Sequence, residues 1–347
     1  MSYNKGNDTE VFFMINEIKE MMKRFPVIDK DSYKILELLA LSDKEKLSMM
    51  ELTRLESELN VIRQTGTADL FLFALDCAKN LNGKMHFRGV FNNSYLAFIL
   101  GITRVDSLSY NLPFERFLCA CKKQIPPLTM VVNRGDKEKL INALYETYGW
   151  ERIGRCKDDE NSFVIAEKLL GEYCQDTEIK LHATVGETVW REQILPLTVR
   201  EANNNYLYVL EILEEKVLKN YRCPTEREVY EFALKWFNAR ATEYVIESYT
   251  GSVDLHKILK HTNNRCLYQE QLMQIYIEVL GVDGITAEQW RKDICIRRPK
   301  KMQEIKEVFE NKLGIDGVKL YEYLSRNAIY MVAKGYLVGE LINLSGE

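Results

Sequence analysis

The stretch NLPFERFLCACKKQIPPLTMVV, Asn111–Val132, decides the fold of this chain. Its last residues, TMVV, are apolar and rich in β-branched side chains, which predicts a short buried strand. Two prolines precede this segment, and proline is tolerated at the start of a strand but not in its centre. Glu115 is the only acidic residue of the stretch, so the predicted strand carries no carboxylate.

The segment NLPFERFL and the hydrophobic SYLAFILGIT before it, Ser94–Thr103, resemble the palm of bacterial replicative DNA polymerase III alpha subunits, polymerase family C. In that family the next element reads Pro-Asp-x-Asp-x-Asp-Phe. An ungapped match from Phe117 places the three acidic positions on Pro127, Thr129 and Val131. The resemblance therefore implies a polymerase scaffold whose catalytic carboxylates have been replaced.

Polymerase chemistry explains why these replacements matter. Phosphoryl transfer uses two metal ions about 3.5–4 Å apart, which stabilise the attacking and leaving oxygens. Mg²⁺ takes oxygen ligands, usually carboxylates together with substrate phosphates and water. Pro127 offers no ligand and the neutral hydroxyl of Thr129 cannot replace an anion, so we expect no catalytic residue and no metal site here. The nearest acid downstream, Asp136, lies at a register that the ungapped match does not support.

A second motif of the family is a glycine-rich loop, Gly-Arg-Gly-Ser-x-x-Gly-Ser. In this chain Arg88, Gly89 and Ser94 fall in step with it, and the resemblance makes them candidates for nucleotide binding. The residues Val90–Asn93 replace the family's other small residues. Glycine lets backbone N–H groups approach a triphosphate closely, and larger side chains oppose that approach. We therefore expect a damaged nucleotide loop.

The block Leu255–Phe309 resembles the finger domain of the same family. It contains YQEQLMQI, Tyr268–Ile275, which matches the family's Tyr-Gln-Glu-Gln-x-Met-Gln-Ile. Pro299 and Met302 then follow at the family's spacing. Two long motifs in the family's order indicate homology, whereas a lone YQEQ would not.

The chain departs from the family at two further places. Where the family reads Asn-Lys-Ser-His-Ala, Ser325 matches, but the lysine and histidine positions hold Leu324 and Arg326. The family's segment between palm and fingers is shortened here to Asn133–Asp254, and it normally carries another catalytic acid in an Asp-Phe-Leu-Gly-Leu setting. We expect no counterpart of that acid in this chain.

Overall charge argues against an autonomous tight DNA-binding protein but allows a local contact. The net charge is −4 and the pI about 5.8, whereas such proteins carry a strongly basic surface. The segment RKDICIRRPKK is locally basic, and in the family it faces the nucleotide and template. A solvated helix end is an equally good interpretation. The candidate DNA-contacting residues there are Arg291, Lys292, Arg297, Arg298, Lys300 and Lys301.

The fold is predicted to be α+β and predominantly helical, with a polymerase-beta-like nucleotidyltransferase palm and a helical finger domain. The 347 residues, 46% of them hydrophobic, suffice for a large core divided into about two or three domains. We divide the chain into an N-terminal helical segment, 1–55, a palm-like region with a shortened, helix-rich middle, 56–250, and a finger-like helical region, 251–347.

Apolar spacing predicts several individual elements. Helices are expected over Glu10–Lys23, over Ser42–Ile62 with Ser42 as N-cap, over Glu201–Asn220, and over Thr225–Tyr249. Thr286 is the expected N-cap of a further helix. The segments FVIAEKLL and EIKLHATV have strand-like features, although helix stays open for the first.

Composition excludes several classes of protein. No apolar run approaches the ~20 residues that a transmembrane helix needs. Eight cysteines without a CxxC pair, and no secretory signal, predict a cytoplasmic protein with unpaired thiols. The four histidines lack metal-ligand spacing with cysteine. No cofactor is therefore expected.

Three functions remain open at this point. The preferred one is a catalytically degenerate relative of polymerase III alpha that acts as a DNA-replication-associated binding protein, with primer-template DNA or replisome proteins as partners. The first alternative is a divergent active DNA polymerase or nucleotidyltransferase with metal ligands from elsewhere, and only this one would require Mg²⁺. The second alternative is a pure protein-interaction module for the replisome.

Overall fold

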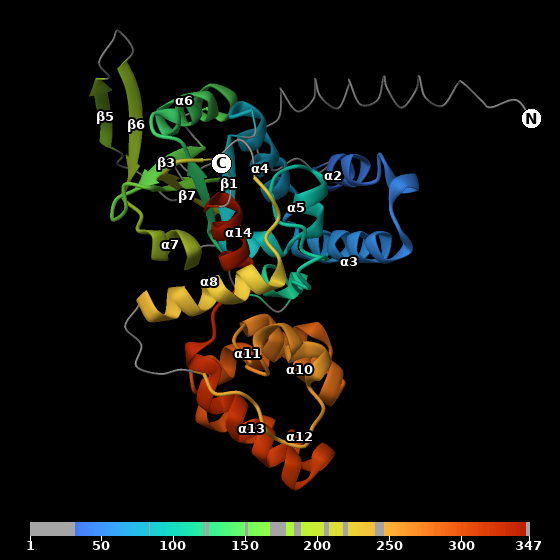
Figure 1. Cartoon of the computed structure of the whole chain (residues 1–347). Helices are drawn as coiled ribbons and strands as arrows, with labels where there is room; N and C mark the ends of the chain where they lie inside the picture. The colour runs from blue at the N-terminus through green and yellow to red at the C-terminus, as the bar shows by residue number, and fades with distance from the viewer. Residues whose placement is uncertain are drawn as a thin grey trace, which may run out of the picture. The chain divides into compact units, whose positions relative to one another are not determined.

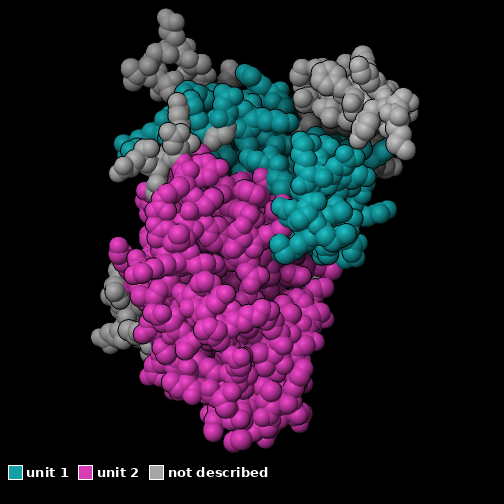
Figure 2. Space-filling view, turned by 45° about the vertical axis from the view of Figure 1, so that its right-hand side comes forward, with its two compact units in different colours: residues 1–85, 99–102, 123–217 teal, residues 86–98, 103–122, 218–347 magenta. Residues whose placement is uncertain are grey.

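The structure, a computed structural model, divides into two compact units, which Figure 2 shows in different colours, and each unit combines segments from separate parts of the sequence. Unit 1 comprises 1–85, 99–102 and 123–217, and unit 2 comprises 86–98, 103–122 and 218–347. The division into consecutive segments 1–55, 56–250 and 251–347 stays a prediction. The helix expected over Glu10–Lys23 lies outside the described residues, which are 32–82, 84–120, 122, 125–149, 152–166, 178–183, 189–204, 208–217, 221–239 and 246–344.

Unit 1 is built on a mixed sheet, in which six strands follow the order β2-β7-β4-β3-β6-β5. The pairs β2–β7 and β3–β6 are parallel, and the other neighbouring strands of this order are antiparallel. A further strand, β1 (Met85–Arg88), crosses the border between the units. The bounds of the six strands are β2 Leu128–Val132, β3 Ile153–Cys156, β4 Ser162–Ile165, β5 Glu178–Ala183, β6 Val189–Leu195 and β7 Tyr208–Glu214.

Helix α3 of unit 1, Met49–Thr65, begins with a capping box. The hydroxyl of Ser48 accepts from the backbone N–H of Glu51, whose carboxylate accepts from the backbone N–H of Ser48. This capping box satisfies two backbone donors that a helix start leaves free. The expected N-cap at Ser42 is therefore wrong. The helices are α2 Ser32–Ala40, α3 Met49–Thr65, α4 Ala68–Asn80, α6 Asp136–Tyr148 and α7 Val199–Asn204, with the 3₁₀ turn η1 Lys44–Lys46.

Strand β7 lies in the middle of the helix expected over Glu201–Asn220, so the prediction of one continuous helix is wrong. The chain forms α7 as far as Asn204 and then β7, which pairs with β2 on one side and β4 on the other. A short apolar run such as YVLEILE fits a strand buried between neighbours as well as it fits a helix. Pairing on both sides of β7 decides in favour of the strand.

Unit 2 is mainly helical, and Figure 1 shows α10 to α13 gathered in one group of helices. Its core includes the fully buried Tyr268, Tyr276 and Phe309. The finger-like region is helical, as predicted, and the α8 part of the helix expected over Thr225–Tyr249 is confirmed, whereas Ile246–Tyr249 are not helical. The elements are η2 Gly89–Asn93, α5 Tyr95–Ile99, η3 Phe114–Arg116, α8 Glu226–Ala239, α9 His256–Leu259, η4 Lys260–Thr262, α10 Gln269–Leu280, α11 Gly284–Cys295, α12 Pro299–Leu313, α13 Ile315–Asn327, η5 Ala328–Tyr330 and α14 Lys334–Leu344.

The structure corrects two further expectations, one about a helix N-cap and one about the cysteines. The N-cap of α11 is Asp283, whose carboxylate accepts from the backbone N–H of Thr286 at 2.7 Å. Thr286 is thus the capped residue rather than the cap. Cys119 is disulfide-bonded, so the expectation of unpaired thiols fails there, whereas Cys77 and Cys266 are buried free thiols. Within the described ranges, every helix is too short or too polar to cross a bilayer.

Candidate functional site

Strand β2 is where the family's acidic positions fall. Pro127 is exposed just before the strand, Thr129 is half-buried, and Val131 is fully buried. Alternating side chains point to opposite faces, so Thr129 and Val131 share one face of β2. The only polar side-chain atom that β2 contributes is therefore the hydroxyl of Thr129.

A carboxylate lies beside that hydroxyl, on the parallel neighbour β7. Thr129 and Glu211 are register partners, and the Thr129 hydroxyl donates a 2.8 Å hydrogen bond to Glu211 Oε2. The expectation that the segment Asn133–Asp254 holds no counterpart of the family's further acid stays a prediction, and Glu211 lies within that segment. Glu211, Ile212 and Leu213 follow the order acid, apolar residue, leucine of the family's Asp-Phe-Leu setting. The incorrect helix prediction concealed this match, because only a strand places Glu211 beside β2.

The described side chains around Thr129 do not fit a two-metal site. Glu211 is the single carboxylate next to Thr129 along the β2–β7 pair. Asp136 begins α6, where its carboxylate pairs with Lys139 at 3.0 Å. Among the described residues, no group of three or more His, Cys, Asp or Glu side chains is placed to hold a metal ion. One carboxylate with a neutral hydroxyl supplies too few ligands for two divalent cations.

The segment in step with the glycine-rich motif forms the 3₁₀ helix η2 in unit 2. Gly89 adopts a positive φ of 74°, which glycine accepts without strain. Asn92 and Asn93, at positions where the family has small residues, are buried. Asn92 Nδ2 donates to the carbonyl of Phe87 at 3.0 Å, and Asn93 Nδ2 donates to the carbonyl of Pro113 at 3.1 Å. The larger side chains therefore fill the loop and fix it to its surroundings.

Helix α14 covers this filled loop. Its Gly335 carbonyl accepts from Asn92 Nδ2 at 3.2 Å. A Cβ on Gly335 would lie 2.5 Å from Asn93 Oδ1, and one on Gly339 would lie 2.5 Å from Asn92 Nδ2. Only glycine allows this approach, because real Cβ atoms do not come so close to other heavy atoms.

The candidate nucleotide-binding residues of the loop have partners within the chain. The Arg88 guanidinium forms an ion pair with the carboxylate of Glu340 on α14. Ser94 is fully buried, and its hydroxyl accepts from the backbone N–H of Ala97 at 3.1 Å. Their assignment to nucleotide binding stays a prediction, and a ligand would have to compete with these contacts.

Side chains of the Tyr-Gln-Glu-Gln motif in the finger-like region make buried hydrogen bonds. Glu270 is almost fully buried, and its carboxylate accepts from the backbone N–H of Lys334 at 2.8 Å. Gln271 Oε1 accepts from the backbone N–H of Leu267 at 2.9 Å, while its Nε2 donates to Thr262 Oγ1 at 2.9 Å. A buried polar group costs stability unless it has such partners. These contacts give the motif a structural role in unit 2.

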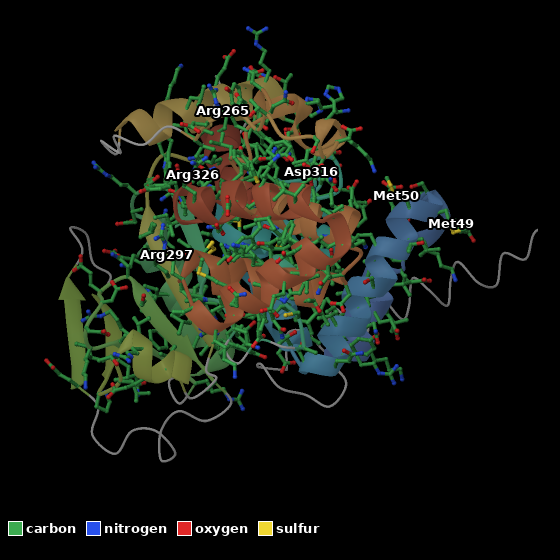
Figure 3. All side chains as sticks on the ribbon, turned by 90° about the horizontal axis from the view of Figure 1, so that it is seen from below. Met49, Met50, Arg265, Arg297, Asp316 and Arg326 are labelled. Carbon is green, nitrogen blue, oxygen red and sulfur yellow. The ribbon has the colours of Figure 1, made fainter. Side chains whose placement is uncertain are left out.

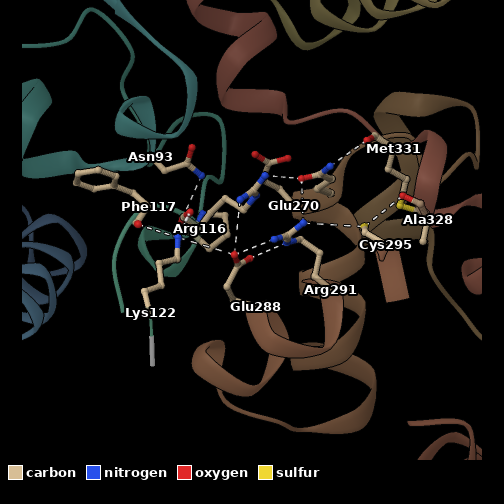
Figure 4. A network of polar contacts seen from close by, with 12 residues as sticks. Asn93, Arg116, Phe117, Lys122, Glu270, Glu288, Arg291, Cys295, Ala328 and Met331 are labelled. Atoms are coloured by element: carbon tan, nitrogen blue, oxygen red, sulfur yellow. Dashed lines mark hydrogen bonds and ion pairs between the residues drawn. The ribbon is translucent and has the colours of Figure 1, made fainter. Parts of the chain in front are cut away.

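A buried ionic network in unit 2 surrounds Glu288 (Figure 4). Arg291 makes two bonds to this carboxylate, of 2.7 and 2.9 Å. Arg116 lies 3.6 Å and Lys122 lies 3.8 Å from Glu288 Oε1. Burial lowers the pKa of Lys122 to about 7, although Glu288 acts in the opposite direction. The side chains of Arg116, Lys122 and Arg291 thus gather around one carboxylate, and no sequence pattern predicts that they meet.

The basic segment divides between the interior and the surface. Arg291 is buried in the Glu288 network and does not lie on the surface. Arg298 pairs with Asp293 at 2.7 Å, and Lys301 pairs with Glu304 at 2.6 Å. Figure 3 shows Arg297 and Arg326 on the same side of unit 2. We call the exposed set the α11–α12 basic surface, and it consists of Lys292, Arg297, Arg298, Lys300 and Lys301.

Arg297 holds an unusual backbone conformation on this surface. It follows α11 with a positive φ of 53°. Glycine is the usual residue at a left-handed helix end, and other residues cost about 1–2 kcal/mol there. The chain thus keeps an exposed arginine where glycine would be more stable.

Comparison with known proteins finds two family matches in different parts of the chain. Residues 19–160 match the family described as bacterial DNA polymerase III alpha NTPase domain. Residues 225–316 match the bacterial DNA polymerase III alpha subunit finger domain. This chain therefore carries the palm and finger domains of bacterial DNA polymerase III alpha over part of its length.

Individual relatives share about a third of the aligned residues. The DNA polymerase III subunit alpha of Mycoplasma genitalium is 34% identical over 106 residues, which cover 29% of this chain and 12% of that protein. That of Ureaplasma parvum is 30% identical over 161 residues, or 40% of this chain and 16% of that protein. The error-prone DNA polymerase of Cutibacterium acnes is 32% identical over 108 residues, which cover 30% of this chain and 10% of that protein. The matched part is thus a small share of each relative.

Proposed function

We propose that this chain is a catalytically degenerate relative of polymerase III alpha that binds DNA in a replication setting without extending it. The observation that carries the proposal is the pairing of Thr129 with Glu211 at 2.8 Å, where polymerase chemistry needs several carboxylates around two cations. The filled loop at Asn92 and Asn93 supports it, since that loop holds side chains where a triphosphate would need open backbone.

The α11–α12 basic surface supports the DNA-binding part of the proposal. Its exposed lysines and arginines suit the phosphate backbone, which supplies most of the sequence-independent affinity for DNA. Arg297 adds a specific argument, because its left-handed backbone carries a cost that glycine would avoid. A side chain kept at such a cost is expected to serve binding rather than stability.

Arg297→Gly separates binding from stability. We expect the free energy of unfolding to rise by about 1 kcal/mol, while binding to labelled primer-template DNA weakens. Fluorescence anisotropy over a salt series measures the binding, and each lost phosphate contact should reduce the salt slope by about 0.9. Lys319→Gln, at a 65% exposed side chain on α13, is the matched control and should leave binding unchanged.

Two results would overturn the proposal in different directions. Primer extension by the purified chain with Mg²⁺ or Mn²⁺, abolished by Glu211→Gln, would establish an active divergent polymerase. Absence of any salt-dependent DNA binding by the wild-type chain would instead favour a pure protein-interaction module.

A further inference from the structure

Two exposed isoleucines lie at the α11–α12 basic surface. Ile296, the C-cap of α11, is 52% exposed, and Ile329 on η5 is 41% exposed. Their backbones adjoin, because each directly follows one member of a contacting pair, in which Cys295 Sγ donates to the carbonyl of Ala328 at 3.3 Å. A single exposed apolar side chain needs no explanation. Two that adjoin among exposed cations form a mixed surface that a partner can cover.

The corner between α11 and α12 fixes the backbone at Ile296. The backbone N–H of Arg297 donates to the carbonyl of Ile294 at 3.1 Å, and that of Arg298 donates to the carbonyl of Asp293 at 3.0 Å. These two hydrogen bonds form the Schellman ending of a helix. An apolar contact often accompanies this ending, but here the side chains of Arg298 and Asp293 form an ion pair of 2.7 Å instead. The corner is therefore ordered before a partner arrives, which reduces the entropy lost on binding.

Exposed cations flank Ile296 on both sides. Lys292 lies one helical turn before it, and Arg297 and Lys300 follow it. The side chains of these three cations form no ion pair or hydrogen bond within the described part of the chain. The surface therefore suits a partner that carries negative groups with apolar faces between them.

We propose that this surface binds single-stranded DNA, with Ile296 and Ile329 against unpaired bases and the three flanking cations against phosphates. The inference rests on the DNA binding proposed above and adds which form of DNA is preferred. In a duplex the faces of the bases are stacked on one another, so an apolar side chain reaches them only after a base step has been unstacked. A single strand offers the same faces without that cost.

An acidic protein segment would meet the same cations. The match of residues 225–316, which contain the α11–α12 corner, to a polymerase finger domain favours DNA. Unpaired bases also explain the isoleucines, because phosphates lie on both sides of each base along a strand.

The test is fluorescence anisotropy of the full chain with three labelled probes of equal length. These are an oligothymidylate, the same strand with abasic sites in place of its central bases, and a blunt duplex. We expect the oligothymidylate to bind about tenfold more tightly than the abasic strand, because only bases can cover the isoleucines. The two strands carry the same phosphates, so the salt slope should be equal for both. The duplex should bind more weakly than the oligothymidylate at the same salt concentration.

Ile296→Ser separates the apolar contact from the charges. It should weaken oligothymidylate binding about fivefold without changing the salt slope, whereas Arg297→Gly should reduce that slope. The matched control is Ile315→Ser, at an isoleucine that is 68% exposed and separated from Ile296 by the length of α12. It should bind like the wild-type chain, and thermal melts check that both serine variants fold.

The outcomes separate this inference from the DNA binding on which it rests. Equal binding of the oligothymidylate and the abasic strand by the wild-type chain would overturn the preference for unpaired bases and leave DNA binding intact. A preference that persists unchanged in Ile296→Ser, or an equal loss in Ile315→Ser, would place the base contact elsewhere. Absence of binding to all three probes would overturn DNA binding itself, and tight binding of a polyglutamate peptide would then assign the surface to an acidic protein segment.

Discussion

The hydroxyl of Thr129 donates a 2.8 Å hydrogen bond to the carboxylate of Glu211 on the neighbouring parallel strand. A hydroxyl can satisfy a carboxylate without a cation, whereas a second carboxylate at this distance would repel it. The pair therefore stabilises the β2–β7 junction in the absence of metal. Substitutions at Thr129 can therefore test whether this pair of strands binds a divalent cation.

Thr129→Asp should make unit 1 dependent on divalent cations. Two carboxylates in contact repel, so we expect the free energy of unfolding to fall by about 1–3 kcal/mol without metal. Mn²⁺ should restore part of that loss, because a ligand that binds only the folded state stabilises it. Thermal melts with and without Mn²⁺ measure both effects.

The matched control for this site is Thr129→Val, which keeps the shape of the side chain and removes the hydroxyl. It should lose about 1 kcal/mol, the usual contribution of one hydrogen bond, and show no response to Mn²⁺. An equal Mn²⁺ response in the valine variant would show that the ion binds elsewhere.

Glu288→Gln should be among the most destabilising single changes in unit 2. Removing the carboxylate leaves Arg116, Lys122 and Arg291 buried without their shared partner, and breaking a buried pair costs about 3–5 kcal/mol. Chemical denaturation measures the loss. Glu304→Gln, which breaks the exposed pair with Lys301, should cost under about 1 kcal/mol. Similar losses in both variants would contradict the central role of Glu288.

Gly339→Ala tests the packing of α14 on η2. The added Cβ would lie 2.5 Å from Asn92 Nδ2, so we expect a loss of about 1–3 kcal/mol. Asn92→Ala removes two hydrogen bonds but also makes room for that Cβ. The double variant should therefore be more stable than the sum of the two single losses predicts. Additive losses in a double-mutant cycle would mean that the two residues do not meet.

His86 should make the chain sensitive to mild acid. It is 2% exposed, and burial together with Arg88 and Arg104 lowers its pKa to about 3. Below the unfolded pKa of about 6.5, the unfolded chain takes up a proton that the folded chain refuses, so stability falls as pH drops from about 6.5 towards 3. By pH 5 the loss should be about 2 kcal/mol.

Urea unfolding at pH 7 and pH 5 measures this effect. His86→Leu removes the titrating group and should reduce the loss between the two pH values. The exposed His256→Gln is the control and should keep the wild-type response. An unchanged loss in His86→Leu would assign the acid sensitivity to other groups.

The sequence predicted those parts of the molecule that local pattern determines. The strand at Leu128–Val132 and the helical character of the finger-like region follow from apolar spacing and from motifs matched in order. Strand β7 did not follow, because a short apolar run becomes a strand only through pairing with β2 and β4. The preference of a residue for helix or strand can be read from the local sequence, whereas strand pairing depends on residues far away in the chain.

The site was predictable to a similar extent. The replacements at Pro127, Thr129 and Val131 are readable from an ungapped match alone. Glu211 was missed because its neighbour Thr129 lies 82 positions earlier in the chain. The Glu288 network was missed for the same reason, since Arg116 and Lys122 come from a segment far from α11.

The hydrogen bond between Glu270 and the start of α14 has a consequence for biosynthesis. The carboxylate of Glu270 finds its backbone donor at Lys334, 64 residues further along the chain. While the chain emerges from the ribosome, α10 is therefore made long before the backbone N–H that donates to its buried carboxylate. Unit 2 can reach its final packing only after Lys334 has left the exit tunnel, so a pause in translation before that point would expose an incompletely packed finger region to proteases and chaperones.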